Sequence, residues 1–234
     1  ADSRARLVAD GASGTGPVVY WMQRETRVED NWSLLYAQRH ALERGRGLEV
    51  VFCVAPAFQG AGERQYKFLL RGLSGIPAGL ARHGIAFRLL SGDPATEIVR
   101  HVREVSACAL FADFNPVRAP RRWLREIAAA GVCPVYEVDA HNIVPCWLAS
   151  DHAEYGAWTL RPKLLRLLPR FLTEFPALGR QPARLALSAT PRSPLDALPS
   201  GLRLYASGAG ITLPSGEAAA RTRLRDFLAT CLDA

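Results

Sequence analysis

The feature that most constrains the fold of this 234-residue chain is a series of short apolar runs separated by amphipathic stretches. Each run is too short for a membrane helix and too continuously apolar for a strand with one face in water. Runs of this kind are typical of parallel strands that are covered on both faces. They lie at residues 18–22, 48–55, 85–90, 107–114 and 132–140.

The stretches between these runs have the periodicity of helices that bury one face. One begins after Asp30 or Asn31, and a second spans roughly residues 63–83, where Pro77 should break or kink it. Two more begin near Pro94 and Pro120. The alternation predicts an α/β fold with a doubly wound, five-stranded parallel sheet.

In such sheets ligands bind beyond the carboxyl ends of the strands, where the strand order reverses. The candidate loops are therefore 23–31, 56–63, 91–94, 113–120 and 139–147. No G-x-G-x-x-G follows the first run and no G-x-x-x-x-G-K-[ST] occurs, so a standard dinucleotide site or P-loop is not expected.

The composition along the chain indicates four segments. Residues 1–16 are expected to form a flexible N-terminus, and 17–175 hold the α/β domain. Residues 176–214 are rich in Pro, Ala, Ser and Gly, which is typical of a linker. A new helix begins in 215–234, and its apolar stripe has no later partner in the chain and could drive self-association. The stripe consists of Leu224, Phe227, Leu228 and Leu232.

Charge and cysteine usage narrow the class of protein only in part. The formal net charge of +7 favours a polyanionic partner such as nucleic acid, but it fits a soluble basic surface equally well. The five cysteines are widely spaced and form no C-x-x-C, which argues against a disulfide framework or a zinc site. We expect a cytoplasmic protein with reduced thiols, no bound metal and no membrane segment.

Local clusters of reactive residues could take part in catalysis or binding, or they could have a structural role only. Cys146, His141 and Asp139 could form a nucleophile with its base, but no glycine loop that would bind an oxyanion accompanies them. Asp151 and His152 do not add a recognised metal-ligand spacing. An arginine cluster surrounds Trp123, and we favour a solvated helix face over a nucleic-acid contact there. It consists of Arg118, Arg121, Arg122 and Arg125.

Several stretches taken together resemble class II cyclobutane pyrimidine dimer photolyases. They are YWMQRETRVEDNWSLLYAQ, RQYKFLLRGL, FADFNPVRAPRRW, VDAHNIVPCWLASDHAEYGAWTLRPK and FLTEFP. VDAHNIVPCW and DFNPVRAPRRW carry the resemblance to that class, whereas R-x-x-R-x-x-D-N is shared by photolyases and cryptochromes. The resemblance covers about residues 17–176, and Trp158 stands where the class usually has Arg.

The resemblance implies a two-domain, light-driven DNA repair enzyme. Its α/β domain would hold an antenna chromophore, often a deazaflavin, and its helical domain would hold FAD and the flipped pyrimidine dimer. Excited reduced flavin would donate an electron to the dimer, the cyclobutane ring would split, and the electron would return. The chain ends where the resemblance places the start of the helical domain. We therefore expect no catalytic residues in this polypeptide, no repair by it alone, and weak or no binding of UV-damaged DNA.

The resemblance also suggests antenna-site residues at the strand ends. Trp21 and Met22 could form a wall for an aromatic ring, and Arg24 and Arg27 could bind an acidic tail or hold neighbouring loops. The others follow the fourth and fifth predicted strands: Asp113, Phe114, Asn115, Asp139, His141 and Asn142. The alternative is that these polar residues satisfy loop backbone or contact the helical domain.

Two other functions remain open from the sequence. One is a fragment of a cryptochrome-like flavin photoreceptor, because the distinguishing features would lie beyond this chain. The other is a non-enzymatic nucleotide-binding α/β module. VDAHNIVPCW argues against the module, since a generic domain does not need that stretch.

Overall fold

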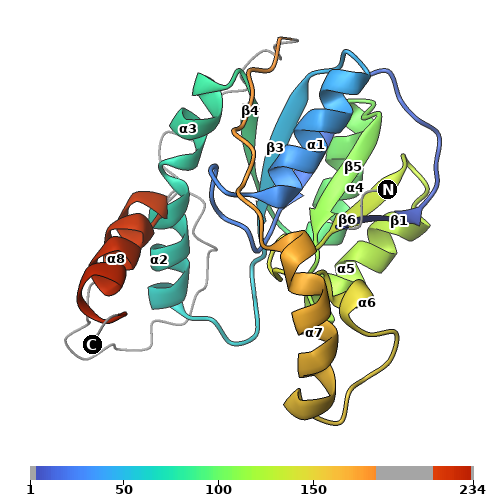
Figure 1. Ribbon diagram of the computed structural model, residues 1–234. Coiled ribbons are helices and arrows are strands. Elements are labelled where there is room, and N and C mark those ends of the chain that lie inside the picture. The colour runs from blue at the N-terminus through green and yellow to red at the C-terminus, as the bar shows by residue number, and fades with distance from the viewer. Residues whose placement is uncertain (1–3, 183–212, 233–234) are drawn as a thin grey trace.

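The computed structural model describes residues 4–182 and 213–232 and has a sheet with helices on both faces (Figure 1). Its strands are β1 Ala5–Ala9, β2 Val18–Met22, β3 Leu48–Val54, β4 Ala86–Ser91, β5 Ala109–Asp113 and β6 Val135–Val138. Its helices are α1 Trp32–Glu43, α2 Glu63–Leu73, α3 Ile76–Arg82, α4 Pro94–Glu104, α5 Arg118–Ala129, α6 Cys146–Ala149, α7 Ala157–Phe171 and α8 Glu217–Thr230. The predicted α/β class, with a mostly parallel sheet, is confirmed.

The sheet reverses its strand order beside β2. The strands lie in the order β1-β6-β5-β2-β3-β4, and β2 pairs in parallel with both β3 and β5. The chain proceeds from β2 outward to β3 and β4, then returns to the other side of β2 for β5 and β6. The switch point therefore lies between the carboxyl ends of β2 and β5, where open α/β sheets bind ligands.

Two apolar layers hold the helices against the sheet. One face buries side chains of α1, α2 and α3, including Leu34, Leu70 and Leu80. The opposite face buries side chains of α4 and α5, including Ile98 and Ile127. The predicted break at Pro77 is confirmed, because α2 ends at Leu73 and the proline occupies the first turn of α3, where its missing N–H costs nothing.

The N-terminal segment differs from the flexible lead-in that the sequence suggested. Residues Ala5–Ala9 form a sixth strand, antiparallel to β6. Arg4 is 4% exposed, and its guanidinium donates to the carbonyl oxygens of Asn142 and Ile143 at 2.8 and 2.6 Å. The strand lies at the sheet edge with mostly exposed side chains, so its sequence lacks the apolar pattern by which the inner strands were found.

The segment expected to be a linker begins on the surface of the α/β domain. Gln38 forms two hydrogen bonds with the Gly179 backbone, both 2.9 Å long, and the Gln181 N–H donates to the His83 carbonyl at 2.7 Å. Residues 176–182 are thus attached to the domain. Most of the proposed linker, 183–212, lies outside the described residues.

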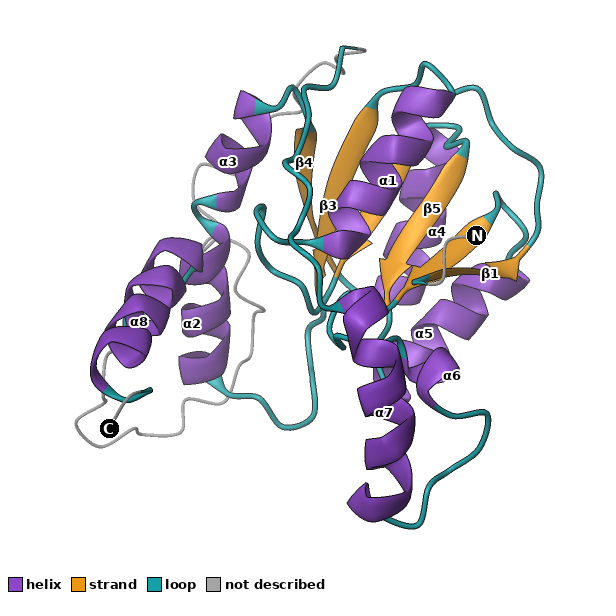
Figure 2. Cartoon of the chain, viewed as in Figure 1, coloured by secondary structure: helices purple, strands orange, loops and turns teal. Residues whose placement is uncertain are grey.

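Helix α8 lies beside α2 (Figure 2). The Glu217 carboxylate accepts hydrogen bonds from the backbone N–H groups of Val28 and Glu29 at 2.9 and 3.0 Å. The four apolar residues of its stripe are 46–62% exposed. Of the helices described, none is both long and apolar enough to span a membrane.

Gly16 lets the segment before β2 approach the α4–β5 turn closely. Its N–H donates to the Ser106 carbonyl at 2.8 Å, and a Cβ at this position would overlap the carbonyl oxygen of Val105. We expect Gly16→Ala to lower the free energy of unfolding by about 2–4 kcal/mol, because backbone must move to relieve the overlap. Urea denaturation measures this. Gly75→Ala is the control, because a Cβ at Gly75 meets nothing within 4 Å; equal stability of the two variants would contradict the close approach.

Candidate functional site

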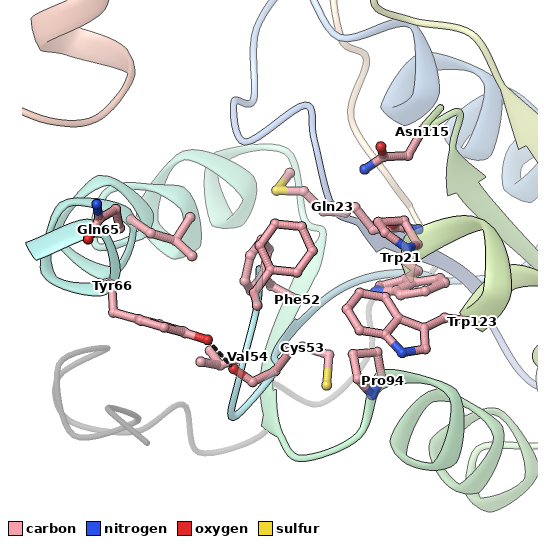
Figure 3. A pocket seen from close by; sticks show the side chains of 15 residues that line it. Trp21, Gln23, Phe52, Cys53, Val54, Gln65, Tyr66, Pro94, Asn115 and Trp123 are labelled. Atoms are coloured by element: carbon pink, nitrogen blue, oxygen red, sulfur yellow. Dashed lines mark hydrogen bonds between the residues drawn. The ribbon is translucent and has the colours of Figure 1, made fainter. Parts of the chain in front are cut away.

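A cavity of about 250 Å³ opens beside the carboxyl ends of β2 and β3 (Figure 3). Strands β2 and β3, the loops that follow β2, β3 and β5, and the helices α2, α4 and α5 contribute to it. Its lining residues are Trp21, Met22, Gln23, Phe52, Cys53, Val54, Ala55, Phe58, Gln65, Tyr66, Leu69, Pro94, Asn115, Pro120 and Trp123. This is the ligand edge of the sheet, next to the switch point, so the fold places the cavity where its class binds ligands.

Aromatic side chains from four elements surround the cavity. Trp21 lies near the end of β2 and is 2% exposed, and Trp123 comes from α5. The Phe58 ring, on the β3–α2 loop, lies 6.0 Å from the Trp123 ring and is tilted 35° to it. Tyr66 of α2 donates its hydroxyl proton to the Ala55 carbonyl at 2.7 Å, which fixes its ring. Such walls can hold a planar aromatic ligand by stacking.

The described residues of the lining carry no charge at neutral pH. None of the fifteen lining residues is Asp, Glu, Lys, Arg or His. Burial raises the pKa of the Cys53 thiol to about 12, with a smaller contribution from Glu97, and burial also raises the pKa of the Tyr66 hydroxyl. An uncharged aromatic ring fits this surface, whereas a phosphate would find no basic side chain to pair with.

Asp113, at the end of β5, holds the loop that follows β2. Its carboxylate is 1% exposed and accepts the Tyr20 hydroxyl proton at 2.7 Å. It also accepts hydrogen bonds from the backbone N–H groups of Gln23, Arg24 and Glu25 at 2.9, 2.9 and 3.0 Å. Burial, and then Asp113 itself, raise the pKa of Tyr20, which keeps the hydroxyl a donor. Asp113 thereby fixes the position of Gln23 at the cavity.

Most of the charged residues after β2 form ion pairs, and Glu29 and Asp30 pair with Arg221 of α8. Glu25 is 1% exposed and forms an ion pair with Arg27, and its carboxylate lies 3.1 Å from His141 Nδ1. The Asn31 amide donates to the carbonyl oxygens of Glu25 and Arg27, and its oxygen accepts from the Leu34 N–H at the start of α1. These charges fold the loop and do not line the cavity.

Asp139 organises the loop after β6 in the same way. Its carboxylate accepts from the backbone N–H groups of Asn142 and Cys146 at 3.0 and 2.8 Å, and from the Asn142 amide. Burial, with Asp139 as the next cause, raises the pKa of the Cys146 thiol to about 11, and His141 contacts Glu25 instead. A thiol of that pKa without a base is not an activated nucleophile.

The structure thus divides the residues proposed from the sequence into two groups. Trp21, Met22 and Asn115 line the cavity. The others lie in or beside the loops around it: Arg24, Arg27, Asp113, Phe114, Asp139, His141 and Asn142. Phe114 is buried with its ring at right angles to that of Trp147, 5.7 Å away. In the residues described, no group of three or more His, Cys, Asp or Glu could hold a metal ion.

Most of the aromatic wall was missed from the sequence. Phe52, Tyr66 and Trp123 have the spacing of ordinary core residues, and nothing in a single sequence separates a cavity wall from a filled core. Phe58 did carry a signal, because it stands alone as a large apolar residue in the loop 56–62. A half-buried aromatic residue in a loop at the ligand edge is a candidate for contact with a ligand.

Comparisons with known proteins agree with this architecture. A family model described as DNA photolyase matches residues 18–182. A deoxyribodipyrimidine photo-lyase of Potorous tridactylus is 40% identical over 214 residues, covering 90% of this chain and 40% of that protein. One of Oryza sativa subsp. japonica is 42% identical over 185 residues, covering 75% of this chain and 36% of that protein. The chain therefore spans about 40% or less of these relatives.

Solved structures match the fold at lower identity. A bacterial class III photolyase from Agrobacterium tumefaciens superposes with a TM-score of 0.60 at 19% identity, covering 94% of this chain and 46% of that one. A cryptochrome of Synechocystis sp. PCC6803 gives a TM-score of 0.61 at 16% identity, covering 93% and 47%. At these identities the likeness supports the arrangement of the elements and does not distinguish between the functions.

Proposed function

The chain belongs to the DNA photolyase family, whose model matches residues 18–182, and from that premise we propose that it is the antenna domain of a light-driven enzyme that splits cyclobutane pyrimidine dimers. The relatives named deoxyribodipyrimidine photo-lyase support this activity for the whole protein. The observation that carries the chain's own part is the uncharged, aromatic cavity at the ligand edge of the sheet. A deazaflavin bound there would supply absorption of near-UV or blue light.

The finer assignment within the family is class II. The stretches VDAHNIVPCW and DFNPVRAPRRW support it. Their residues form the two loops whose carboxylates, Asp113 and Asp139, hold the ligand edge together. A cryptochrome-like photoreceptor shares the α/β fold and remains the second candidate, but no feature of the cavity favours it.

The remaining properties are proposed for the whole protein. FAD and UV-damaged DNA would be held by its helical part, and the protein would work in the cytoplasm. We propose no catalytic residue within the part of the chain that the structure describes. The isolated chain would self-associate through the exposed apolar stripe of α8 and the residues just after it, at 224–232.

The cavity argues against the nucleotide-binding alternative. Nucleotide sites pair phosphates with basic side chains or with a glycine-rich loop at a helix N-terminus. Among the described residues the cavity lining has no basic side chain, and no P-loop follows β2. A ring-binding site explains the apolar walls better.

Titration of the purified chain with a deazaflavin tests the proposed function. We expect saturable uptake with one site per chain, followed by a shift of the near-UV band and a change in chromophore fluorescence as the ring enters an apolar site. A chain that stays colourless and takes up no deazaflavin would overturn the antenna assignment.

A second experiment illuminates the chain with dimer-containing DNA. It should remove no dimers above the dark control. Repair by the isolated chain would contradict the proposal that this domain does not repair DNA alone.

A further inference from the structure

We propose that the cavity selects its ligand by carbonyl oxygens on an uncharged ring, and that the carboxamide nitrogen of Asn115 is the donor that recognises a ring carbonyl. The inference rests on the proposed function, because it specifies the chemistry of the same site. It goes further by assigning the polar part of recognition to neutral N–H groups. The arginines that follow β2 take no part in it.

The Asn115 side chain has one end fixed and one end free. Its oxygen accepts the Val117 backbone N–H at 3.1 Å, which determines which end of the amide is the oxygen. Its nitrogen has no partner among the described residues. Asn115 is half-buried at the edge of the cavity, on the side of β5 (Figure 3). A ligand in the cavity can therefore meet an unused N–H donor at this end.

Gln65 has the same pattern of hydrogen bonding, but it is exposed and lies at the outer rim of the cavity. Its oxygen accepts the Gly62 backbone N–H at 3.1 Å, so its nitrogen is again the end without a described partner. Figure 3 places Gln65 on α2, across the cavity from Asn115. The carboxamide of Gln23, between them, makes no hydrogen bond to described residues, and its oxygen is buried without a donor; turned over, the amide would present its nitrogen to a ligand.

The other polar side chains of the lining do not offset this bias toward donors. The Tyr66 hydroxyl is directed to the Ala55 carbonyl, and the Cys53 thiol lies 3.8 Å from the Gly92 carbonyl. The Trp123 indole N–H has no hydrogen-bond partner among the described residues. With the Asn115 donor at the cavity edge, the Gln65 donor at the exposed rim and no cation among the described lining residues, the lining suits neutral carbonyl oxygens. A cavity of about 250 Å³ accommodates a ring system and leaves a charged tail outside.

Asn115→Asp tests the donor with little disturbance of the loop, because a carboxylate still accepts the Val117 N–H. The probes are lumichrome, a neutral three-ring compound with two carbonyls, and phenazine, a three-ring compound without carbonyls. We expect the unmodified chain to bind lumichrome at least about 10-fold more tightly than phenazine, the worth of one good hydrogen bond. In Asn115→Asp the affinity for lumichrome should fall by about 10-fold or more, and that for phenazine should change little.

Gln59→Glu is the matched control, since it adds the same charge on the exposed β3–α2 loop outside the lining. It should bind both probes as the unmodified chain does. Equal lumichrome affinity in Asn115→Asp and the unmodified chain, or equal affinity of the unmodified chain for both probes, would overturn the inference. Asn115-dependent binding of lumichrome without uptake of deazaflavin would preserve the inference and overturn the antenna assignment. Binding of neither probe would overturn the inference directly.

Discussion

Replacing Asp113 by alanine is expected to lower the free energy of unfolding by about 3–5 kcal/mol. The carboxylate accepts four hydrogen bonds of 2.7–3.0 Å, one from the Tyr20 hydroxyl and three from consecutive backbone N–H groups. The alanine variant would leave all four donors without their acceptor at a buried strand end, and each unpaired buried donor costs on the order of 1–3 kcal/mol. Urea denaturation followed by circular dichroism measures the loss.

Two further variants separate this role from a general effect of charge. Asp226→Ala, on the exposed face of α8, should change stability by no more than about 0.5 kcal/mol. Asp113→Asn keeps the shape and one acceptor oxygen, so it should fall between the unmodified chain and Asp113→Ala. An Asp113→Ala variant within about 1 kcal/mol of the unmodified chain would show that the loop after β2 does not depend on this carboxylate.

Replacing Leu69 by tryptophan is expected to weaken chromophore binding by roughly 100-fold, because stacking in an aromatic site is worth about 1–3 kcal/mol per ring and the new side chain takes the ring's place. Leu69 lines the cavity from α2 and is half-buried, so the larger side chain can enter the cavity without displacing core residues. Fluorescence titration with a deazaflavin measures the affinity, and thermal unfolding checks that the fold is retained.

Phe68→Trp is the matched control for this variant. Phe68 precedes Leu69 on the same helix, is 48% exposed and does not line the cavity. The control adds the same indole to α2, so it should bind the chromophore with unchanged affinity. If Leu69→Trp bound it as tightly as Phe68→Trp, the ligand would lie somewhere other than this cavity.

The inner part of the sheet was predictable because the apolar pattern that indicates each strand lies within the strand itself. Continuous apolar runs, each followed by a helical stretch, predict buried parallel strands, and they located Trp21 and Met22 at the end of the first inner strand. The edge strand β1 was missed because its partner, β6, lies some 130 residues away and its side chains are mostly exposed. Its anchor, Arg4, depends on carbonyl groups that only the folded loop brings together.

The candidate site was predictable only in its location. The fold class indicates the carboxyl edge of the sheet, but polar residues there can either bind a ligand or fold the loops, and sequence position does not distinguish the two. Asp113, Asp139 and Glu25 fold the loops because their carboxylates meet backbone N–H groups or neighbouring side chains. The aromatic wall combines residues from separate elements, such as Phe58 and Trp123, so it emerges only when the helices pack.

We propose that this domain holds a light-absorbing ring in the uncharged cavity beside the carboxyl ends of β2 and β3. A crystal structure of the chain bound to a deazaflavin tests it most directly. We predict that the ring lies between Trp21, Phe58 and Tyr66, with a ring carbonyl within hydrogen-bond distance of the Asn115 nitrogen and any charged tail in solvent. A ring bound elsewhere, for example on the Asp139–Cys146 loop or on α8, with the cavity empty, would contradict the account.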